Sequence, residues 1–329
     1  MNDLNASVVA CDYDCGDAFG FGQGFTLLGC EDMQHPSVPQ LDPYYQFRVD
    51  KLEALLQFLA EPEGDGFYLF GPYGTGKTSL VTQTLARLNW PVQSITAWGR
   101  MELTDLIGGF RMTQKEPGQA PVMEFAYGPL PLAMKLGHVL LINEIDTVDP
   151  EQLVGLNDII EGQPLLIPET NELIRPHPMF RVVANGNTAL QGSASYVGTQ
   201  IQNPAFADRF TPMQVGYMDP ATEEGLIKSK YTDIDRNGYV SKMVRVANMI
   251  RKQFIDTSGT RSRDALSVTM STRTLCRWAH RSIQNSPKPD PLRAGLDLAL
   301  LNRCAATDHE AIRKIVEGVF GSQYSASWS

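Results

Sequence analysis

Residues 66–78 read Gly-Phe-Tyr-Leu-Phe-Gly-Pro-Tyr-Gly-Thr-Gly-Lys-Thr, and this stretch decides the fold. Its second part, Gly71–Thr78, matches the pattern G-x-x-x-x-G-K-[S/T] at every specified position. The apolar run Gly66–Phe70 predicts a strand before the motif, and the pattern of Thr78–Leu88 predicts a helix after it. A strand, a glycine-rich turn and a helix in this order are typical of a loop that binds the phosphates of a nucleotide.

The residue types of this loop explain how it would hold phosphates. Glycines let the backbone wrap closely around an anion, so that its N–H groups point inward, and the N-terminal end of the next helix also favours negative charge. Lys77 can reach the β- and γ-phosphates, and the hydroxyl of Thr78 can bind Mg²⁺. We therefore expect ATP and Mg²⁺ to bind the whole loop, which consists of Gly71, Pro72, Tyr73, Gly74, Thr75, Gly76, Lys77 and Thr78.

Strand and helix patterns alternate on both sides of this loop. Helices are predicted at Val49–Ala60 and from the N-cap Asp149 to about Glu161. Strands are predicted at Gly66–Phe70, Val92–Ile95, His138–Ile142, Met179–Ala184 and Pro212–Tyr217. Strands separated by helices favour a parallel sheet that is covered by helices on both faces, so the fold class is α/β.

The pattern after Asp219-Pro220, a second N-cap pair, is helical. Apolar residues form one stripe from Val240 to Phe254, and further helices are predicted at Thr272–Arg281, Leu292–Cys304 and His309–Phe320. We therefore expect an irregular N-terminal segment at residues 1–45, an α/β nucleotide-binding domain at residues 46–218 and a helical domain at residues 219–329.

The most apolar predicted strand is followed by Asn143 and Glu144, where nucleotide hydrolases of this kind normally carry Asp-Glu. Glu144 fits the role of the residue that orients the attacking water. Asn143 can hold a metal-bound water through its carbonyl oxygen but brings no negative charge, so we expect weaker Mg²⁺ binding and continued hydrolysis. A protein that binds ATP and hydrolyses it poorly is the alternative. Asp146 either compensates in part for the missing carboxylate or serves as a turn residue.

Composition and charge limit the classes of function. The 329 residues are 43% hydrophobic and 20% charged, which is ordinary for a globular protein. The net charge of −9 argues against sequence-independent binding to nucleic acid, and so against a DNA-translocating helicase loader. The sequence has no run of about 18 apolar residues and no signal-peptide pattern at its start, so we expect no membrane span and a cytoplasmic location.

Other metal chemistry has little support in the sequence. The five cysteines are odd in number and form no C-x-x-C pair, so a disulfide framework is not expected. Free thiols are the favoured interpretation of Cys11, Cys15 and Cys30, with a metal site that includes His35 as the weaker alternative. No H-E-x-x-H motif occurs, which argues against a hydrolase with protein-bound zinc.

Several motifs, taken in order, resemble the MoxR branch of the AAA+ ATPases. Within that branch they are most similar to the S subunit of the aerobic cobalt chelatase (CobS) and to the CbbQ/NorQ activases. The resemblance covers roughly residues 40–320 and implies an AAA+ core, a C-terminal helical lid and a ring-shaped oligomer, for which a hexamer is the family expectation. Beside the phosphate loop it is carried by Leu103–Gly108, Phe125–Leu130, Leu166–Thr170, Ile174–Arg181, Ala184–Thr188, Asn203–Phe210 and Met270–Thr274.

The resemblance also implies roles for individual polar residues. Asn187 corresponds to sensor 1, which reads the γ-phosphate and the water, and Arg209 corresponds to the arginine finger supplied to a neighbouring subunit. Arg273 corresponds to sensor 2 on the lid. Positioned arginines suit these roles because their planar fork neutralises charge on the transferred phosphoryl group. With Glu144, these three are the expected catalytic residues.

The expected metal ligands are Thr78 and Asn143. The sequence departs from the family pattern at Asn143 and at Asn185, where this branch often has threonine.

Three hypotheses for the function remain open. The first is an ATPase that remodels or activates a partner protein, which in this family often carries a von Willebrand A domain; the Gly109–Glu124 insertion and the Pro164–Arg175 hairpin would then face the substrate. The second is the ATPase subunit of a metal chelatase that inserts cobalt into a corrin ring. The third is a nucleotide-gated scaffold that assembles with ATP but turns over little because of Asn143.

Overall fold

The computed structural model describes residues 7–32, 34–114, 120–193, 196–235, 238–254 and 266–328. Contacts divide the chain into two compact units. The first consists of Met1–Asp42, Phe47–Pro72 and Lys77–Val215. The second consists of Gly216–Ser329 together with two short segments, Pro43–Gln46 and Tyr73–Gly76. None of the helices in the described residues is both long and apolar enough to span a membrane.

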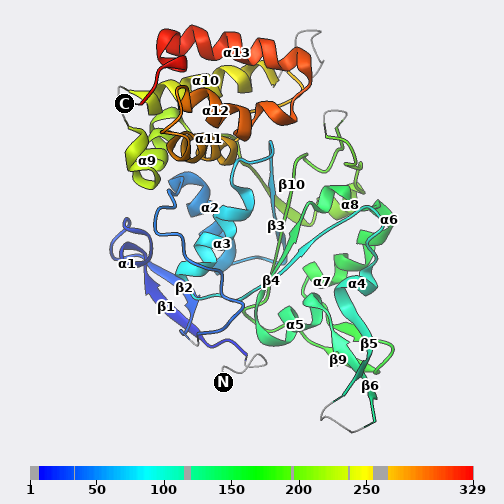
Figure 1. The fold of residues 1–329 in the computed structure, drawn as a ribbon. Coiled ribbons are helices and arrows are strands. Elements are labelled where there is room, and N and C mark those ends of the chain that lie inside the picture. Colours follow the sequence, from blue (N-terminus) through cyan, green and yellow to red (C-terminus); the bar gives the residue numbers. More distant parts are fainter. Residues whose placement is uncertain are drawn as a thin grey trace. The chain divides into compact units, whose positions relative to one another are not determined.

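A five-stranded sheet forms the centre of the first unit (Figure 1). Its order is β11-β3-β10-β7-β4, and every neighbouring pair is parallel, as the sequence predicts. The predicted strands all occur, with ends that differ by a few residues. Their bounds are β3 (Gly66–Phe70), β4 (Val92–Thr96), β7 (Val139–Asn143), β10 (Arg181–Gly186) and β11 (Phe210–Gln214).

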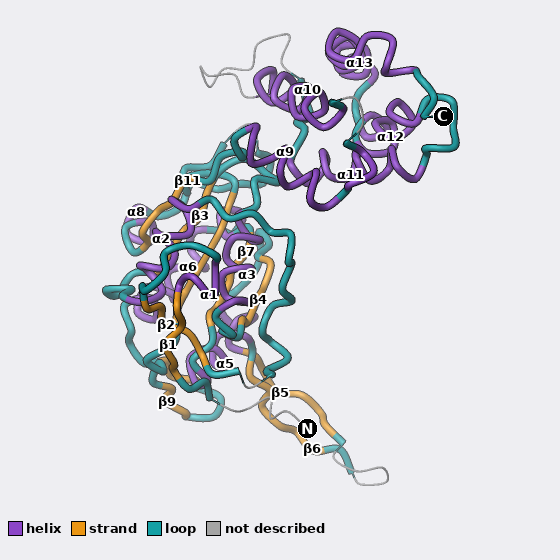
Figure 2. The backbone as a smooth tube through the Cα atoms, turned by 90° about the vertical axis from the view of Figure 1, so that its left-hand side faces the viewer, coloured by secondary structure: helices purple, strands orange, loops and turns teal. Residues whose placement is uncertain are grey.

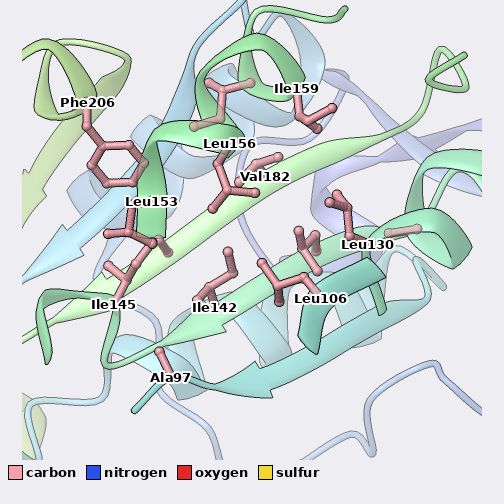
Figure 3. Close-up of a cluster of buried hydrophobic side chains, with 14 of the residues drawn as sticks. Ala97, Leu106, Leu130, Ile142, Ile145, Leu153, Leu156, Ile159, Val182 and Phe206 are labelled. Carbon is pink, nitrogen blue, oxygen red and sulfur yellow. The ribbon is translucent and has the colours of Figure 1, made fainter. Parts of the chain in front are cut away.

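Helices cover both faces of this sheet. Successive residues of its central strands point to opposite sides and are apolar, so both faces need to be covered. On β7, Val139 and Leu141 belong to one core cluster, which includes residues of α2 (Val49–Ala60) and α3 (Lys77–Arg87). Leu140 and Ile142 belong to the other. Figure 3 shows this second cluster, in which Ile142 and Val182 pack with Leu130, Leu156 and Phe206.

The helices on this second face are short. They are α4 (Leu103–Ile107), α5 (Pro129–Leu136), α6 (Pro150–Leu153), α7 (Asn157–Ile160) and α8 (Pro204–Ala207). The single helix predicted from Asp149 to Glu161 is wrong, because α6 and α7 are separated by the 3₁₀ turn η2 (Val154–Leu156). The Leu103 side chain packs so closely at Gly155 that a Cβ there would lie 2.4 Å from it, which explains a glycine at the break.

The prediction of an irregular segment at residues 1–45 is wrong for part of that range. Strands β1 (Ala10–Asp14) and β2 (Thr26–Cys30) form an antiparallel hairpin, with the short helix α1 (Cys15–Phe19) between them. The strands have five residues each, too few to show a clear period in the sequence. Tertiary contacts stabilise the hairpin: the Cys30 amide donates to the Leu88 carbonyl (2.9 Å), and Cys30 is buried.

Two further hairpins lie in the segments that resemble family insertions. They are formed by β5 (Gly108–Thr113) with β6 (Val122–Tyr127), and by β8 (Leu165–Ile167) with β9 (Glu172–Ile174). Figure 2 shows the β5–β6 hairpin extending away from the sheet. Residues 115–119 of the expected insertion lie outside the described residues.

The second unit is helical, as the sequence predicts. Its helices are α9 (Pro220–Lys230), α10 (Tyr239–Phe254), α11 (Thr272–Gln284), α12 (Pro291–Ala299) and α13 (Ala306–Phe320). The predicted N-cap Asp219 accepts a hydrogen bond from the Thr222 amide (3.0 Å). The helix predicted at Leu292–Cys304 is shorter, since α12 ends at Ala299 and a 3₁₀ turn follows.

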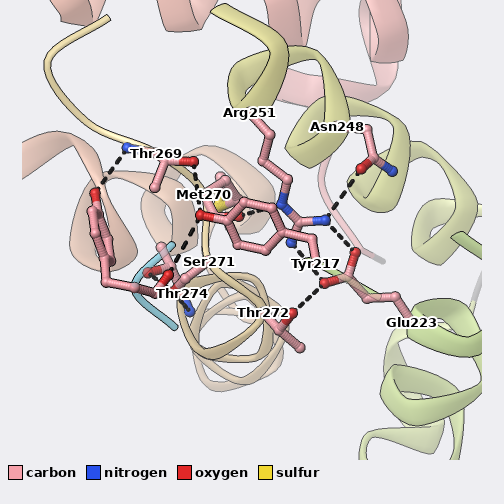
Figure 4. Close-up of polar contacts among 10 residues, drawn as sticks. Tyr217, Glu223, Asn248, Arg251, Thr269, Met270, Ser271, Thr272 and Thr274 are labelled. Carbon is pink, nitrogen blue, oxygen red and sulfur yellow. Dashed lines mark hydrogen bonds and ion pairs between the residues drawn. The ribbon is translucent and has the colours of Figure 1, made fainter. Parts of the chain in front are cut away.

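A buried ion pair joins α9 to α10 in this unit (Figure 4). Arg251 donates to both carboxylate oxygens of Glu223, at 2.8 and 2.7 Å, and to the Met270 carbonyl oxygen at 2.7 Å. Thr272 also donates to Glu223, at 2.7 Å, and the Arg251 guanidinium lies 4.3 Å from the centre of the Tyr217 ring. The pair therefore fixes the chain at residues 270–272, where α11 begins.

A cluster of buried histidines lies at the beginning of β7 in the first unit. His138 is fully buried, its Nδ1 lies 2.9 Å from the Gln93 side-chain nitrogen, and its ring meets the His35 ring edge-on with centroids 4.8 Å apart. The amide of Gln93 donates, so Nδ1 of His138 accepts, and the neutral ring suits this position. Burial, with smaller contributions from His35 and His177, lowers the pKa of His138 to about 4.

His138 makes the stability of the fold depend on pH. The neutral ring is favoured in the folded state, whereas the unfolded chain gains a proton below a pKa of about 6.5, so stability is lost as pH falls from 6.5 towards 4. We expect the free energy of unfolding, measured with urea, to fall between pH 7 and pH 5 by about 2 kcal/mol more in the wild type than in His138→Gln. Equal losses in the two proteins would contradict the assignment.

Candidate nucleotide-binding site

The candidate site lies where three neighbouring parallel strands of the sheet end. The phosphate loop follows β3, and Asn187 follows β10. Asn143 is the last residue of β7, and Glu144 comes directly after it. Because β10 pairs with both β3 and β7, and the carboxyl ends of parallel strands meet at one edge, the three segments are neighbours in space.

The phosphate loop has the backbone that its glycines predict. Gly71, Gly74 and Gly76 have φ angles of 139°, 71° and 89°, which side chains strongly disfavour. A Cβ on Gly71 would also lie 2.4 Å from the Val215 carbonyl oxygen. A larger residue is therefore excluded at Gly71 both by its conformation and by the neighbouring backbone.

Lys77, Asn187 and Glu144 form one hydrogen-bonded row beside the loop. The Lys77 ammonium donates to the Asn187 side-chain oxygen (3.2 Å), and the Asn187 side-chain nitrogen donates to a Glu144 carboxylate oxygen (2.7 Å). Lys77 also donates to the carbonyl oxygens of Gly71 (2.7 Å) and Pro72 (3.0 Å). The structure thus brings together three of the residues that the sequence predicts for the site.

The electrostatics of this row suit an anion. Burial lowers the pKa of Lys77 to about 8, although Glu144 and Asp146 act in the opposite direction. Burial raises the pKa of Glu144, helped by Asp146 and opposed by Lys77 and by the hydrogen bond from Asn187. The hydrogen-bond acceptors around the Lys77 ammonium are uncharged oxygens, so a phosphate here would supply a charged partner for a poorly solvated cation.

Thr78 and Asn143 form a second polar group. The Asn143 side-chain nitrogen donates to the Ser94 hydroxyl (3.0 Å) and to the Ile95 carbonyl oxygen (3.3 Å). A carbonyl can only accept, so the amide orientation is fixed, and the Asn143 oxygen faces Thr78, whose hydroxyl donates to it at 3.0 Å. The Asn185 side-chain nitrogen donates to the same oxygen at 2.7 Å.

This second group fits a hydrated Mg²⁺ ion. Its side chains offer a hydroxyl oxygen from Thr78 and an amide oxygen from Asn143, and Mg²⁺ prefers oxygen ligands and keeps several of its waters. The Asn143 oxygen accepts from both Thr78 and Asn185, so the ion or one of its waters would replace at least one of these hydrogen bonds. The two departures from the family pattern, Asn143 and Asn185, are hydrogen-bonded to each other, so they form one altered unit rather than two separate changes.

Asp146 lies in the 3₁₀ turn η1 (Ile145–Thr147), directly after Glu144. Its side chain accepts hydrogen bonds from Asn187 and Thr188 at the end of β10. The interpretation as a turn residue, which the sequence left open, therefore agrees with its contacts.

The two arginines predicted for catalysis come from other elements than this row. Arg209 follows α8, where its Nε atom lies 2.7 Å from a Glu161 carboxylate oxygen and its Nη1 donates to the Ala205 carbonyl oxygen (2.6 Å). Arg273 is the second residue of α11 in the second unit and is exposed. Ser271 caps that helix by accepting from the Thr274 amide (3.1 Å). The catalytic roles of both arginines stay predictions.

Sequence reasoning missed one contact and left another undecided. Ser94 gives no signal in the sequence, because it lies within β4 and reaches the site only through the pairing of β4 with β7. Asn185 stands out in the sequence as a departure from the family pattern, but its bond to Asn143 depends on the neighbouring positions of β10 and β7.

The sequence of this chain matches two family models and several known proteins. Residues 66–210 match the model of the AAA domain (dynein-related subfamily), and residues 223–319 match the model of the CbbQ/NirQ/NorQ C-terminal domain. The aerobic cobaltochelatase subunit CobS of Sinorhizobium sp. is 30% identical over 291 residues, which cover 86% of this chain and 83% of that protein. An uncharacterized protein of Staphylococcus haemolyticus is 34% identical over 163 residues, which cover 49% of this chain and 59% of that protein.

Among solved structures, a RuvB variant from Thermotoga maritima aligns with a TM-score of 0.45 and 15% identity, over 85% of this chain and 72% of that chain. The family assignment rests on the sequence relatives instead. Because the chain carries both family models in order and covers most of a relative that is 30% identical, it belongs to the MoxR-type AAA+ ATPases, in the group related to CobS and CbbQ.

Proposed function

We propose that this chain couples the binding and hydrolysis of ATP, in the presence of Mg²⁺, to the remodelling or activation of a partner protein, and that it works as a ring-shaped oligomer, expected to be a hexamer. The observation that carries the proposal is the row Lys77–Asn187–Glu144 at the end of the sheet, beside a complete phosphate loop. This row joins a cation for the phosphates to a carboxylate for the attacking water.

Each residue of the row has a separate task in the proposed reaction. The loop backbone and Lys77 bind the β- and γ-phosphates, and Glu144 orients the water and accepts its proton. Asn187 contacts both Lys77 and Glu144, so it can report the γ-phosphate to the carboxylate. Thr78 and Asn143 would hold Mg²⁺, which lowers the cost of developing negative charge on the phosphate oxygens.

Two substitutions separate nucleotide binding from hydrolysis. Lys77→Ala removes the phosphate cation, and we expect weak ATP binding and loss of turnover. Glu144→Gln keeps the size of the side chain but cannot accept a proton, so we expect ATP binding to persist while kcat falls by about 100-fold or more. Phosphate release and binding of a fluorescent ATP analogue measure the two effects. Equal residual rates in the wild type and both variants would refute the proposed hydrolysis.

The ring is proposed because the row contains a single cation. Charge on the transferred phosphoryl group is stabilised in this enzyme class by an arginine from a neighbouring subunit, and Arg209 is the candidate. Arg209 lies on the first unit with its guanidinium partly exposed and paired with Glu161, which keeps it at the surface and oriented.

Complementation tests whether Arg209 acts on a neighbouring subunit. We expect Arg209→Ala and Lys77→Ala each to be nearly inactive, since an arginine finger contributes about 1,000-fold or more to turnover. Mixed in equal amounts, they should recover up to about a quarter of the wild-type rate, because one in four interfaces then pairs an intact loop with an intact arginine. As a control, Arg209→Ala mixed with the double variant should recover nothing. Recovery in that control, or none in the first mixture, would contradict the assignment.

The nature of the partner is proposed from an apolar surface on the first unit. Met112 and Met123 face each other across the β5–β6 hairpin, are 63% and 66% exposed, and lie beside Phe110. An exposed apolar patch on a projecting hairpin is typical of a protein contact. The partner would be a protein, and one with a von Willebrand A domain is the family expectation. No contact with nucleic acid or membrane is proposed, and a cytoplasmic location stays an expectation.

A second candidate function is the ATPase subunit of a complex like cobalt chelatase. The similarity to CobS supports it, because it extends over 86% of this chain and so includes at least part of the helical unit. The site that handles the metal would lie on another subunit. Co-purification of a chelatase-type partner with Glu144→Gln would favour this narrower function.

The third candidate, a nucleotide-gated scaffold with weak turnover, is favoured by Asn143. The substitution Asn143→Asp restores a negative charge near Mg²⁺, so we expect half-maximal ATPase activity at a Mg²⁺ concentration roughly tenfold lower, and a higher kcat. Ser94→Ala, which removes a hydrogen bond from Asn143 without changing charge, is the matched control. A gain in kcat in the Asn143→Asp variant would mean that Asn143 limits turnover, and no gain would count against the scaffold.

A further inference from the structure

We propose that Asp146 is a positioning residue for ATP hydrolysis. It fixes the turn Asn187–Thr188, so that the side-chain amide of Asn187 stays between Lys77 and Glu144. This inference rests on the proposed function of the same site. It assigns to Asp146 a task that differs from metal binding, which the sequence left open.

The geometry of Asp146 is that of a clamp on the end of β10. One carboxylate oxygen, Oδ2, accepts hydrogen bonds from the backbone amides of Asn187 (2.8 Å) and Thr188 (2.9 Å) and from the Thr188 hydroxyl (2.9 Å). The residue is fully buried. Hydrogen bonds to a buried carboxylate are among the strong ones, so the backbone of the turn is held firmly.

Two neighbouring residues are matched to this clamp. The Tyr68 hydroxyl donates to the Thr188 carbonyl oxygen (2.6 Å), so the turn is held from a second side. A Cβ on Gly186 would lie 2.5 Å from the Asp146 carboxylate carbon and 2.3 Å from the Tyr68 hydroxyl. Glycine at position 186 therefore leaves the room that both side chains need to reach the turn.

The clamp acts on the reacting groups through a single residue. The Asn187 backbone amide is bound by Asp146, while the Asn187 side chain contacts Lys77 at 3.2 Å and Glu144 at 2.7 Å. Hydrogen bonds weaken steeply with distance and angle, so a displacement of the turn by about 1 Å would break the row. The Asp146 oxygen Oδ2, with three donors, has no capacity left for a metal ligand, whereas Oδ1 is buried and makes no hydrogen bond within the described residues.

The chain places both carboxylates with one short segment. Glu144 has a left-handed backbone, with φ at 58°, and η1 begins directly after it. The Asp146 carbonyl oxygen accepts from the Gln200 amide (2.7 Å), which adds an anchor for this segment. Glu144 can therefore face the phosphates while Asp146, two residues later, faces the turn after β10.

The test compares Asp146→Ala with Asp146→Asn. Alanine removes the acceptor, and we expect kcat to fall at least tenfold while the KM and the dissociation constant for ATP change less than twofold. Asparagine keeps an oxygen in place of Oδ2, so it should restore most of kcat. The matched control is Asp65→Ala, which removes a partly exposed carboxylate bound to Thr211 and should leave kcat unchanged.

A double-mutant cycle identifies the route of the effect. If Asp146 acts through Asn187, then Asp146→Ala should cause no further loss of kcat in an Asn187→Ala background. Additive losses, or weaker ATP binding at an unchanged kcat, would overturn the proposal. If Asp146→Ala does not fold, Thr188→Val removes one of the three donors, and the same cycle is measured with that variant.

A spectroscopic readout separates this inference from the proposed function. In protein labelled with ¹⁵N-asparagine, the side-chain amide signal of Asn187 should move in Asp146→Ala and return in Asp146→Asn, whether or not ATP is hydrolysed. An unmoved signal overturns the positioning role. A wild type without Lys77-dependent hydrolysis overturns only the proposed function.

Discussion

The pairing of β10 with both β3 and β7 is the constraint on which the site depends. A different part of the site follows each strand: the phosphate loop follows β3, Glu144 follows β7, and the turn Asn187–Thr188 follows β10. Other helices and strands separate these three elements along the chain, so local structure cannot join them, and only the parallel sheet brings their ends together. A parallel sheet with a different strand order would not make Lys77, Glu144 and Asn187 neighbours along this edge.

The few charges at this edge of the sheet affect the expected affinities for the nucleotide and for Mg²⁺. Lys77 brings one positive charge, while Glu144 and Asp146 bring two carboxylates, one of which is used by the turn after β10. An aspartate at position 143 would add a third carboxylate beside a loop that must attract a triphosphate. Asparagine lowers the repulsion of the nucleotide and at the same time gives up attraction for Mg²⁺, so the affinities for the two ligands are expected to change in opposite directions.

The parts of the fold and site that the sequence predicts are those encoded in contiguous residues. The loop Gly71–Thr78 and the strand before it carry their own signal, and so does the run Val139–Glu144. The β1–β2 hairpin is stabilised by contacts such as Cys30 with Leu88, which no local period reveals. The undecided role of Asp146 has the same cause, since metal binding and turn clamping differ only in the position of β10 relative to η1.

For the proposed phosphoryl transfer, the contacts of the row in the first unit supply little positive charge. Among the interactions of its described residues, the row beside the phosphate loop contains Lys77 as its cation, while Arg209 is held by Glu161. The transition state spreads negative charge over three phosphoryl oxygens, which a single ammonium bound on one side stabilises poorly. The proposed function therefore calls for an arginine from outside this row. The proposed candidates are Arg209 of an adjacent subunit and Arg273 of the helical unit, and under the proposal either choice would make turnover depend on how these parts assemble.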